Sequence, residues 1–256
     1  MTGTLRSRAL IAGCVLGVFA TAANAQFNLN LNRLFDTVKS AGTAATEINE
    51  QQEAEIGKDY ASLLVGAAPL VDNADVQRYV NQVGRWLSLN AERPDLNWRF
   101  GVLDSDNINA FATPGGYVFI TRGLLVRLRS EAELAGVLGH EIAHVVKKHH
   151  LNAIRKTAGM QAGANILAEL AAQRGGNRMI SDKLVAGFKE VMLRGLDKDD
   201  EFEADRMGVV IAARAGYDPY GLPAVLQMLQ GMNPQDSGLT LLFATHPTPD
   251  ARLDTL

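Results

Sequence analysis

The sequence has very little cysteine, few aromatic residues and no long apolar run beyond its N-terminus. Its 256 residues include a single cysteine, Cys14, and 6% aromatic residues. If the segment that holds Cys14 is removed, no cysteine remains, so stability has to come from packing and not from disulfides. After that segment no stretch reaches the roughly 18 apolar residues of a membrane span. We therefore expect the remaining chain to be soluble.

Clustered positive charge is also missing. The formal net charge is −3. Residues 1–25 carry Arg6 and Arg8 and no acidic residue, so removing these two positive charges leaves −5 on residues 26–256. No polybasic face stands out, and nucleic acid is therefore not an expected partner.

Residues 1–25 have the pattern of a secretory signal peptide. Arg6 and Arg8 precede an apolar run, and the small residues of Ala23–Ala25 end it, so we expect cleavage after the last of these. The run is short for an uncleaved membrane anchor. The letters IAGC resemble a lipoprotein box, but only about five apolar residues precede Cys14. Lipid anchoring through Cys14 is therefore less favoured than cleavage.

The residues after the leader suit one domain with a full core. Residues 26–46 are rich in asparagine and alanine and are expected to form a loose lead-in to a single domain over 47–256. Apolar residues recur at helical spacing in several segments of that domain. Helices are expected over 47–64, 75–89, 162–173 and 200–216.

Strand patterns and a helix start lie between the second and third of these helices. Residues 98–102 alternate between apolar and other residues, as in a strand. The stretch 109–123 continues this pattern, with the turn Pro114–Gly116 and a strand over 117–121, which predicts a β-hairpin in a small sheet. Ser130 and Glu133 have the S-x-x-E spacing of a capping box before an apolar run. The sequence thus predicts an α+β fold, mainly helical, with a small sheet beside the helix that begins after Ser130.

That helix carries the letters HEIAH. His140 and His144 are four residues apart, so they lie on one face and can both reach one zinc ion. Glu141 is one step round the helix, where a carboxylate can take the proton of a water that zinc has acidified. The pattern arises by chance too, but a capped, periodic helix is the context that H-E-x-x-H requires.

The third zinc ligand is not settled by this spacing. His150 stands where metzincins have their third histidine, but Lys147 replaces the glycine at which their chain leaves the helix. We therefore expect the helix to continue and His150 to point away from the metal. Positive charge is favoured near a helix C-terminus, and this accounts for the polar residues Lys147, Lys148, His149 and His150.

His246 and a carboxylate of residues 197–205 remain as candidates. Glu201 and Asp205 are four apart on one helix face, so one could bind zinc while the other holds a ligand imidazole. Glu203 lies about 160–200° round the helix from both and is expected to face elsewhere. The helix dipole alone accounts for the other acids, Asp197, Asp199 and Asp200.

Four stretches of the sequence follow one another in an order that can be compared with known families. They are NAFATPGGYVFITRGLL (109–125), SEAELAGVLGHEIAHVVKKH (130–149), EFEADRMG (201–208) and THPTPDAR (245–252). Together they resemble the HtpX and CAAX-prenyl-protease family of zinc metallopeptidases. The closest similarity is to its soluble periplasmic branch, the β-barrel-assembly-enhancing protease type. The resemblance runs from about residue 50 to residue 252.

The resemblance implies a gluzincin site with zinc as cofactor. Glu201, the first residue of E-x-x-A-D, would be the third ligand, and Asp205 would support a ligand from behind. His246 would lie over the metal, where it either blocks the site or steadies the transition state. An extended substrate would add a strand to the sheet edge. The substrate-binding residues are then Asn109, Ala110, Phe111, Gly115 and Gly116.

The expected function is that of a periplasmic zinc endopeptidase. It would cut unfolded or misassembled envelope proteins, outer-membrane proteins among them, and could meet the outer-membrane assembly machinery. One alternative is a zinc-binding chaperone or adaptor with little turnover, although a structural zinc needs no base such as Glu141. Another is a latent protease whose metal is covered by His246 or by residues 174–196. The oligomeric state is left open.

Overall fold

A small sheet of three strands lies at the centre of the structure. The structure is a computed structural model and describes residues 49–153, 195–233 and 235–256. The strands are β1 (Arg99–Leu103), β2 (Ala110–Thr113) and β3 (Tyr117–Thr121), in the order β1-β3-β2. β2 and β3 form the expected antiparallel hairpin, whereas β1 pairs with β3 in parallel. Because the sheet ends at β2, that strand is an edge within the described residues.

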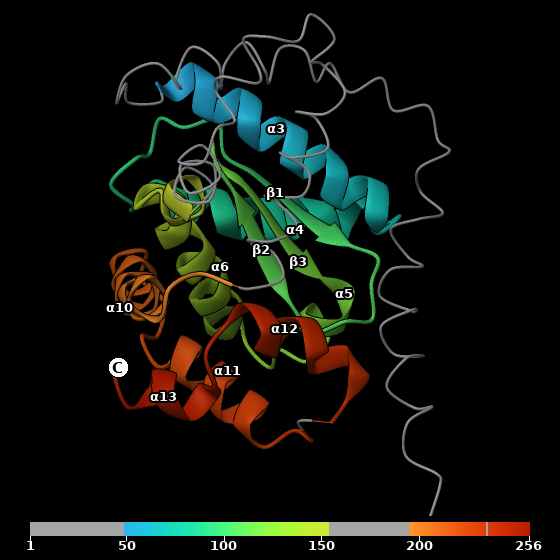
Figure 1. Cartoon of the computed structure of the whole chain (residues 1–256), viewed down its shortest axis with the longest axis vertical. Coiled ribbons are helices and arrows are strands. Elements are labelled where there is room, and N and C mark those ends of the chain that lie inside the picture. Colours follow the sequence, from blue (N-terminus) through green and yellow to red (C-terminus); the bar gives the residue numbers. More distant parts are fainter. Residues whose placement is uncertain (1–48, 154–194, 234) are drawn as a thin grey trace, which may run out of the picture.

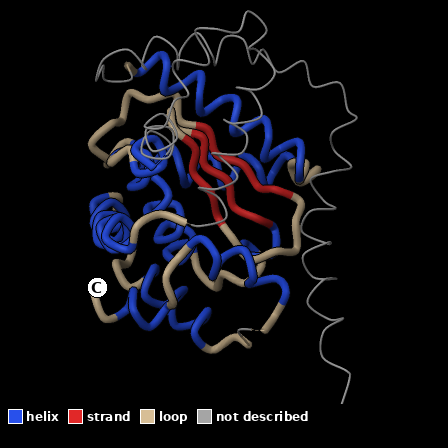
Figure 2. Tube along the Cα trace, viewed as in Figure 1, coloured by secondary structure: helices blue, strands red, loops and turns tan. Residues whose placement is uncertain are grey.

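Helices cover both faces of the sheet. The longer ones are α3 (Glu50–Ala67), α4 (Ala74–Ser88), α6 (Glu131–Val146), α10 (Lys198–Arg214) and α11 (Gly221–Gln230). The shorter ones are α5 (Arg122–Leu125), α12 (Thr240–Thr245) and α13 (Pro249–Leu253), and a 3-10 turn spans Ser237–Leu239. α3 crosses one face, while α4 and α6 pack on the other (Figure 1). Figure 2 shows the red strands enclosed by helices, which confirms a mainly helical α+β fold with a small sheet beside α6.

The start of α6 follows from its sequence. The Ser130 hydroxyl accepts a hydrogen bond from the Glu133 N–H at 3.1 Å, as the capping pattern predicts. The Glu133 carboxylate reaches back to the Arg129 N–H at 2.7 Å, one residue earlier than in a standard capping box. Two N–H groups that would otherwise lack partners are satisfied, which fixes where α6 begins.

α6 is buried along almost its whole length. The residues from Glu133 to Val146 are all buried, because β2 and β3 lie on one side of the helix and α10 and α11 pack against it as well. Burial on all sides fits the mostly apolar composition of this helix. Leu138 and Ile142, both fully buried, anchor it in the main core. The polar residues of H-E-x-x-H therefore sit in the protein interior.

Some expected features lie outside the described residues. These are the leader over 1–25, the lead-in over 26–46, the helix over 162–173 and most of the segment 174–196. Within the described residues, no helix has both the length and the apolar character needed to cross a membrane.

Candidate metal centre and active site

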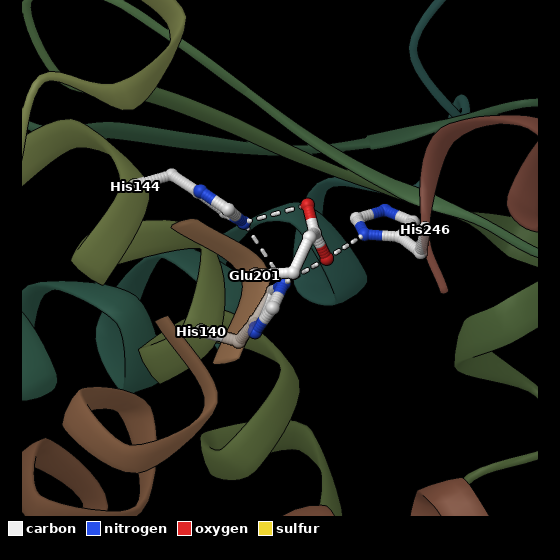
Figure 3. Close-up of side chains that lie close together, drawn as sticks. All are labelled: His140, His144, Glu201 and His246. Atoms are coloured by element: carbon white, nitrogen blue, oxygen red, sulfur yellow. Dashed lines mark hydrogen bonds and ion pairs between the residues drawn. The ribbon is translucent and has the colours of Figure 1, made fainter. Parts of the chain in front are cut away.

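Four side chains from three parts of the chain converge at the C-terminal half of α6. His140 and His144 come from α6, Glu201 from the first turn of α10, and His246 from the residue after α12. Their ligand atoms all lie within 4.8 Å of one another, and Figure 3 shows the side chains pointing toward a common centre. The structure thus brings together the three predicted metal ligands and the predicted catalytic His246.

The donor atoms suit a zinc ion. The two Nε2 atoms of His140 and His144 are 3.0 Å apart. The Glu201 oxygens lie 3.5 Å from His144 Nε2 and 3.7 Å from His140 Nε2. Ligand atoms of a tetrahedral zinc are about 3.3 Å apart. Glu201 Oε1 is moreover buried without a hydrogen-bond partner, a costly state that a bound cation would relieve.

Glu141 stands beside this group without belonging to it. Its side chain is buried, at 3% exposure, and lines both of the small cavities at the site. Burial raises the pKa of Glu141, and the nearby charges of His140 and His246 offset this only in part. A buried carboxylate with a raised pKa next to a metal site has the character of a general base.

His246 is paired with Glu201. Its Nδ1 lies 2.6 Å from Glu201 Oε2. Burial alone would lower the pKa of His246, but the Glu201 carboxylate outweighs burial and raises it. Conversely, burial would raise the pKa of Glu201, and His246 together with other charges lowers it to about 2. Both shifts favour the charged pair of a His246 imidazolium and a Glu201 carboxylate.

His140 is held from behind by a carboxylate and an arginine. Asp205 Oδ1 lies 2.8 Å from His140 Nδ1. Arg252 donates to both Asp205 oxygens, from Nε at 2.8 Å and from Nη2 at 2.5 Å. A carboxylate behind a ligand imidazole fixes the ring and its tautomer. No role for Arg252 follows from its sequence position alone, although it ends the stretch THPTPDAR. In the structure it is buried, and a buried arginine needs a partner.

The expectation that α6 continues through His150 is wrong. The helix ends at Val146, and Lys148 adopts φ 59°, in the left-handed region. The left-handed residue is thus a lysine, one position after Lys147, which replaces the metzincin glycine. The His150 ring consequently lies 5.3 Å from that of His144 and lines a cavity at the site, although His150 is not among the four clustered residues. Burial lowers the pKa of His150 to about 4, so its imidazole is neutral.

The expectation for His149, a polar side chain near a helix C-terminus, does not foresee its burial. His149 is buried, and its Nδ1 lies 2.9 Å from His144 Nδ1. Its Nε2 lies 3.3 Å from Glu203 Oε2. Glu203 does point away from Glu201, as its helical position requires, but it meets the chain that turns back after α6. Burial would raise the pKa of Glu203, and hydrogen bonds from His149 and Lys147 outweigh it and lower that pKa.

The predicted substrate residues at the edge strand line the same cavities. Asn109 is fully buried, and its Oδ1 accepts from the Ala110 N–H at 3.0 Å. Asn109 Nδ2 is buried without a hydrogen-bond partner and belongs to a cavity that Glu141 also lines. Ala110 and Phe111 line the second cavity with Glu141. A free donor thus lies close to the candidate base.

Gly115 and Gly116 have an evident structural role in the hairpin turn. Both have positive φ, 77° and 100°. A Cβ on Gly115 would lie 2.7 Å from Ala54 Cα, and a Cβ on Gly116 would lie 3.4 Å from Trp98. Glycine is required there by backbone geometry and close packing. A substrate contact through these two residues stays a prediction.

Comparison with known proteins identifies relatives of this chain. The profile of peptidase family M48 matches residues 72–256. The beta-barrel assembly-enhancing protease of Escherichia coli (strain K12) is 32% identical over 225 residues, which are 85% of this chain and 46% of that protein. Its namesake in Yersinia pestis is 30% identical over 259 residues, 99% of this chain and 52% of the relative.

A more distant similarity reaches mitochondrial proteins. The mitochondrial metalloendopeptidase OMA1 of Arabidopsis thaliana is 31% identical over 158 residues, 61% of this chain and 30% of that protein. The chain spans about half the length of the assembly-enhancing proteases that it matches.

Proposed function

The chain belongs to peptidase family M48 and has the domain of a metalloendopeptidase, and on this premise we propose that it is a zinc-dependent endopeptidase of the bacterial periplasm that cleaves unfolded or misassembled envelope proteins. One observation carries the proposal. His140, His144 and Glu201 converge on a common centre, and the buried carboxylate of Glu141 stands beside them without being part of the set. A structural zinc has no use for such a carboxylate.

The residues divide the chemistry among them. Zinc held by His140, His144 and Glu201 would polarise a scissile carbonyl and acidify water. Glu141 takes the proton of the attacking water and passes it to the leaving amine. Its raised pKa suits this shuttle, because the group must hold the proton between the two transfers. Asp205 keeps His140 in the tautomer that leaves Nε2 free for the metal.

The substrate would bind along β2 as an added strand. β2 is the edge of the sheet among the described residues, and an extended peptide can pair with such an edge through main-chain hydrogen bonds. Ala110 and Phe111 would provide the backbone partners. Asn109 Nδ2 is a buried donor without a partner, and a substrate carbonyl would satisfy it. An edge that binds backbone and not side chains favours unfolded proteins as substrates.

The substrates and partners of the whole protein rest on its relatives and on its leader. Two relatives are named beta-barrel assembly-enhancing protease, which supports misassembled outer-membrane proteins as substrates and the outer-membrane assembly machinery as a partner. The signal-peptide pattern of residues 1–25 supports export to the periplasm.

A latent form of the same enzyme is favoured by the position of His246. A catalytic zinc keeps one coordination position open, whereas four protein ligands close it. His246 is the fourth member of the cluster, and its Nδ1 already contacts Glu201. We therefore propose that His246 caps the site at rest and has to move before a substrate can bind. A zinc-holding chaperone with little turnover is the remaining alternative.

The test is metal analysis combined with cleavage of unfolded casein by the chain purified without residues 1–25. We expect about one zinc per chain, cleavage that a chelator abolishes, and recovery when zinc is added back. Zinc binding without any cleavage, also in the His246→Ala variant, would favour the chaperone. A protein that binds no zinc would overturn the proposal.

A further inference from the structure

The two histidines of H-E-x-x-H are supported in different ways. Behind His140 stands a carboxylate, with Asp205 Oδ1 2.8 Å from the ring Nδ1. Behind His144 stands another imidazole, with His149 Nδ1 2.9 Å from His144 Nδ1. A carboxylate appears one step further on, because Glu203 Oε2 lies 3.3 Å from His149 Nε2.

Hydrogen positions along this chain follow from the metal-binding role of His144. Its Nε2 faces the centre of the cluster and must be unprotonated to bind zinc, so its Nδ1 carries the hydrogen and donates. His149 Nδ1 must then accept. The single hydrogen of a neutral His149 is therefore on Nε2, where Glu203 accepts it. Every donor in this series of hydrogen bonds meets an acceptor, and the other tautomer of a neutral His149 would not achieve this.

The turn after α6 is what delivers His149 to this position. Lys148 has φ 59°, and its ammonium group lies 3.6 Å from the buried carboxylate of Glu53 on α3. Arg93 pairs with the same carboxylate at 2.8 Å and donates to the Val145 carbonyl at 3.3 Å. This network fixes the turn of the chain after α6. His149, the residue after Lys148, therefore points into the protein and contacts the His144 ring.

The charges around Glu203 suit its place as the last acceptor in the series of hydrogen bonds from His144 through His149. Lys147 Nζ lies 3.3 Å from Glu203 Oε1, so the second carboxylate oxygen is occupied by a cation. Asp200 Oδ1 is the other acidic oxygen near His149, at 3.7 Å from Nε2. Glu203 is thus the nearer acceptor, and it is held in place from its far side.

We propose that His149 is a positioning residue for the metal site. Its ring connects the Glu203 carboxylate to His144 through two hydrogen bonds, and it fixes the His144 ring with Nε2 toward the zinc. The inference rests on the proposed function in one respect, that His144 is a zinc ligand. Hydrogen-bond partners behind a ligand typically change metal affinity by about 10- to 100-fold. His149 therefore acts on how tightly zinc is held and not on the proton transfers at Glu141.

The experiment compares His149→Asn with His149→Gln. The asparagine amide reaches about as far from the backbone as Nδ1 of histidine, so it can still accept from His144. The glutamine amide reaches about as far as Nε2, so it meets Glu203 and leaves His144 without its acceptor. Zinc affinity is measured by competition with a chromogenic chelator. We expect about 10- to 100-fold weaker binding for His149→Gln, and a smaller loss for His149→Asn, which keeps the acceptor for His144 but loses the hydrogen bond to Glu203.

Two further readings separate positioning from packing. Long-range 1H–15N spectra of the zinc-loaded parent should show His149 as the Nε2–H tautomer. Lys147→Ala, which removes the cation beside Glu203 but keeps both hydrogen bonds, should weaken zinc binding less than His149→Gln does. Thermal unfolding of each metal-free variant checks that it folds. Casein cleavage by His149→Gln should recover when zinc is raised well above its dissociation constant.

The outcomes are distinct. Equal zinc affinity for the parent, His149→Asn and His149→Gln would overturn this positioning role, as would an equal loss in both variants or an Nδ1–H tautomer of His149. Failure of the parent to cleave casein while it binds zinc would count against the proposed enzyme and leave the positioning role standing. Failure of the parent to bind zinc would remove both.

Discussion

Gly139 and Gly208 lie in direct contact where α6 crosses α10. A Cβ on Gly139 would lie 2.7 Å from the Gly208 carbonyl oxygen, and a Cβ on Gly208 would lie 2.6 Å from the backbone nitrogen of His140. These distances leave no space for a side chain at either position. The two helices can approach closely for this reason, and the approach brings Glu201 of α10 to His140 and His144 of α6.

Adding a methyl group at this crossing should therefore damage both stability and metal binding. We expect Gly208→Ala to lower the free energy of unfolding by about 1–3 kcal/mol and to weaken zinc binding, because the ligands on the two helices are pushed apart. Urea unfolding and chelator competition measure the two effects. Gly231→Ala is the matched control, since a Cβ there meets no atom nearer than 3.6 Å. Parental behaviour of Gly208→Ala would show that the crossing can yield without cost.

Replacing Glu141 separates chemistry from metal binding. Glu141→Gln keeps the shape of the side chain but cannot take a proton, and Glu141 is not one of the clustered ligands. We expect casein cleavage to fall by about 100- to 10,000-fold, with the zinc content per chain unchanged. Cleavage at the parental rate by this variant would rule out Glu141 as the base.

Removing the His246 imidazole tests the resting cap. His246→Ala deletes the contact with Glu201 Oε2 and would open a fourth position on the metal. We expect faster cleavage of casein, with zinc still bound by the three other ligands. An unchanged rate would argue against a cap, and a slower rate would indicate that His246 assists the reaction.

The Asp205–Arg252 pair should make the metal-free protein sensitive to acid. Burial would raise the pKa of Asp205, but hydrogen bonds from Arg252 and the charge of His140 outweigh it and hold that pKa below its ordinary value. A lowered pKa in the folded state stabilises the protein above about pH 4, the range in which an unfolded aspartate is ionised. This stabilisation is lost as the pH falls through the lowered pKa.

We expect Asp205→Asn to be less stable than the parent at pH 7, because Arg252 loses its buried partner. Below about pH 4 the stability of this variant should change less with pH than that of the parent. Urea unfolding of both chains in the presence of a chelator, at pH 7, 4 and 3, gives the comparison. Parallel pH curves for the two proteins would mean that Asp205 is not the titrating group.

Local patterns in the sequence predicted several of the longer elements and the two histidines that share one helix. The turn Pro114–Gly116 predicted a strand over 117–121 with the bounds that β3 has, and Ser130 predicted the start of α6. The four-residue spacing of His140 and His144 gave two ligands on one face. These inferences succeed because they depend on neighbours within one or two turns of the same element.

The features that were missed depend on distant parts of the chain. The parallel pairing of β1 with β3 follows from how the chain between them folds, and strand alternation does not specify a partner. The left-handed Lys148 is held by Glu53, a residue of α3. Arg252 finds its partner on α10. No local pattern around these residues indicates the contact.

By itself, the sequence determined the helical face that offers two imidazoles, with a carboxylate one step round the helix, because helix geometry fixes the directions of nearby residues. The tertiary structure decided the rest of the site. The glycine crossing of α6 and α10 sets how close Glu201 comes, and the turn at Lys148 sets where His149 points. Both depend on packing between segments far apart in the chain, and such packing has no periodicity that a linear sequence can reveal.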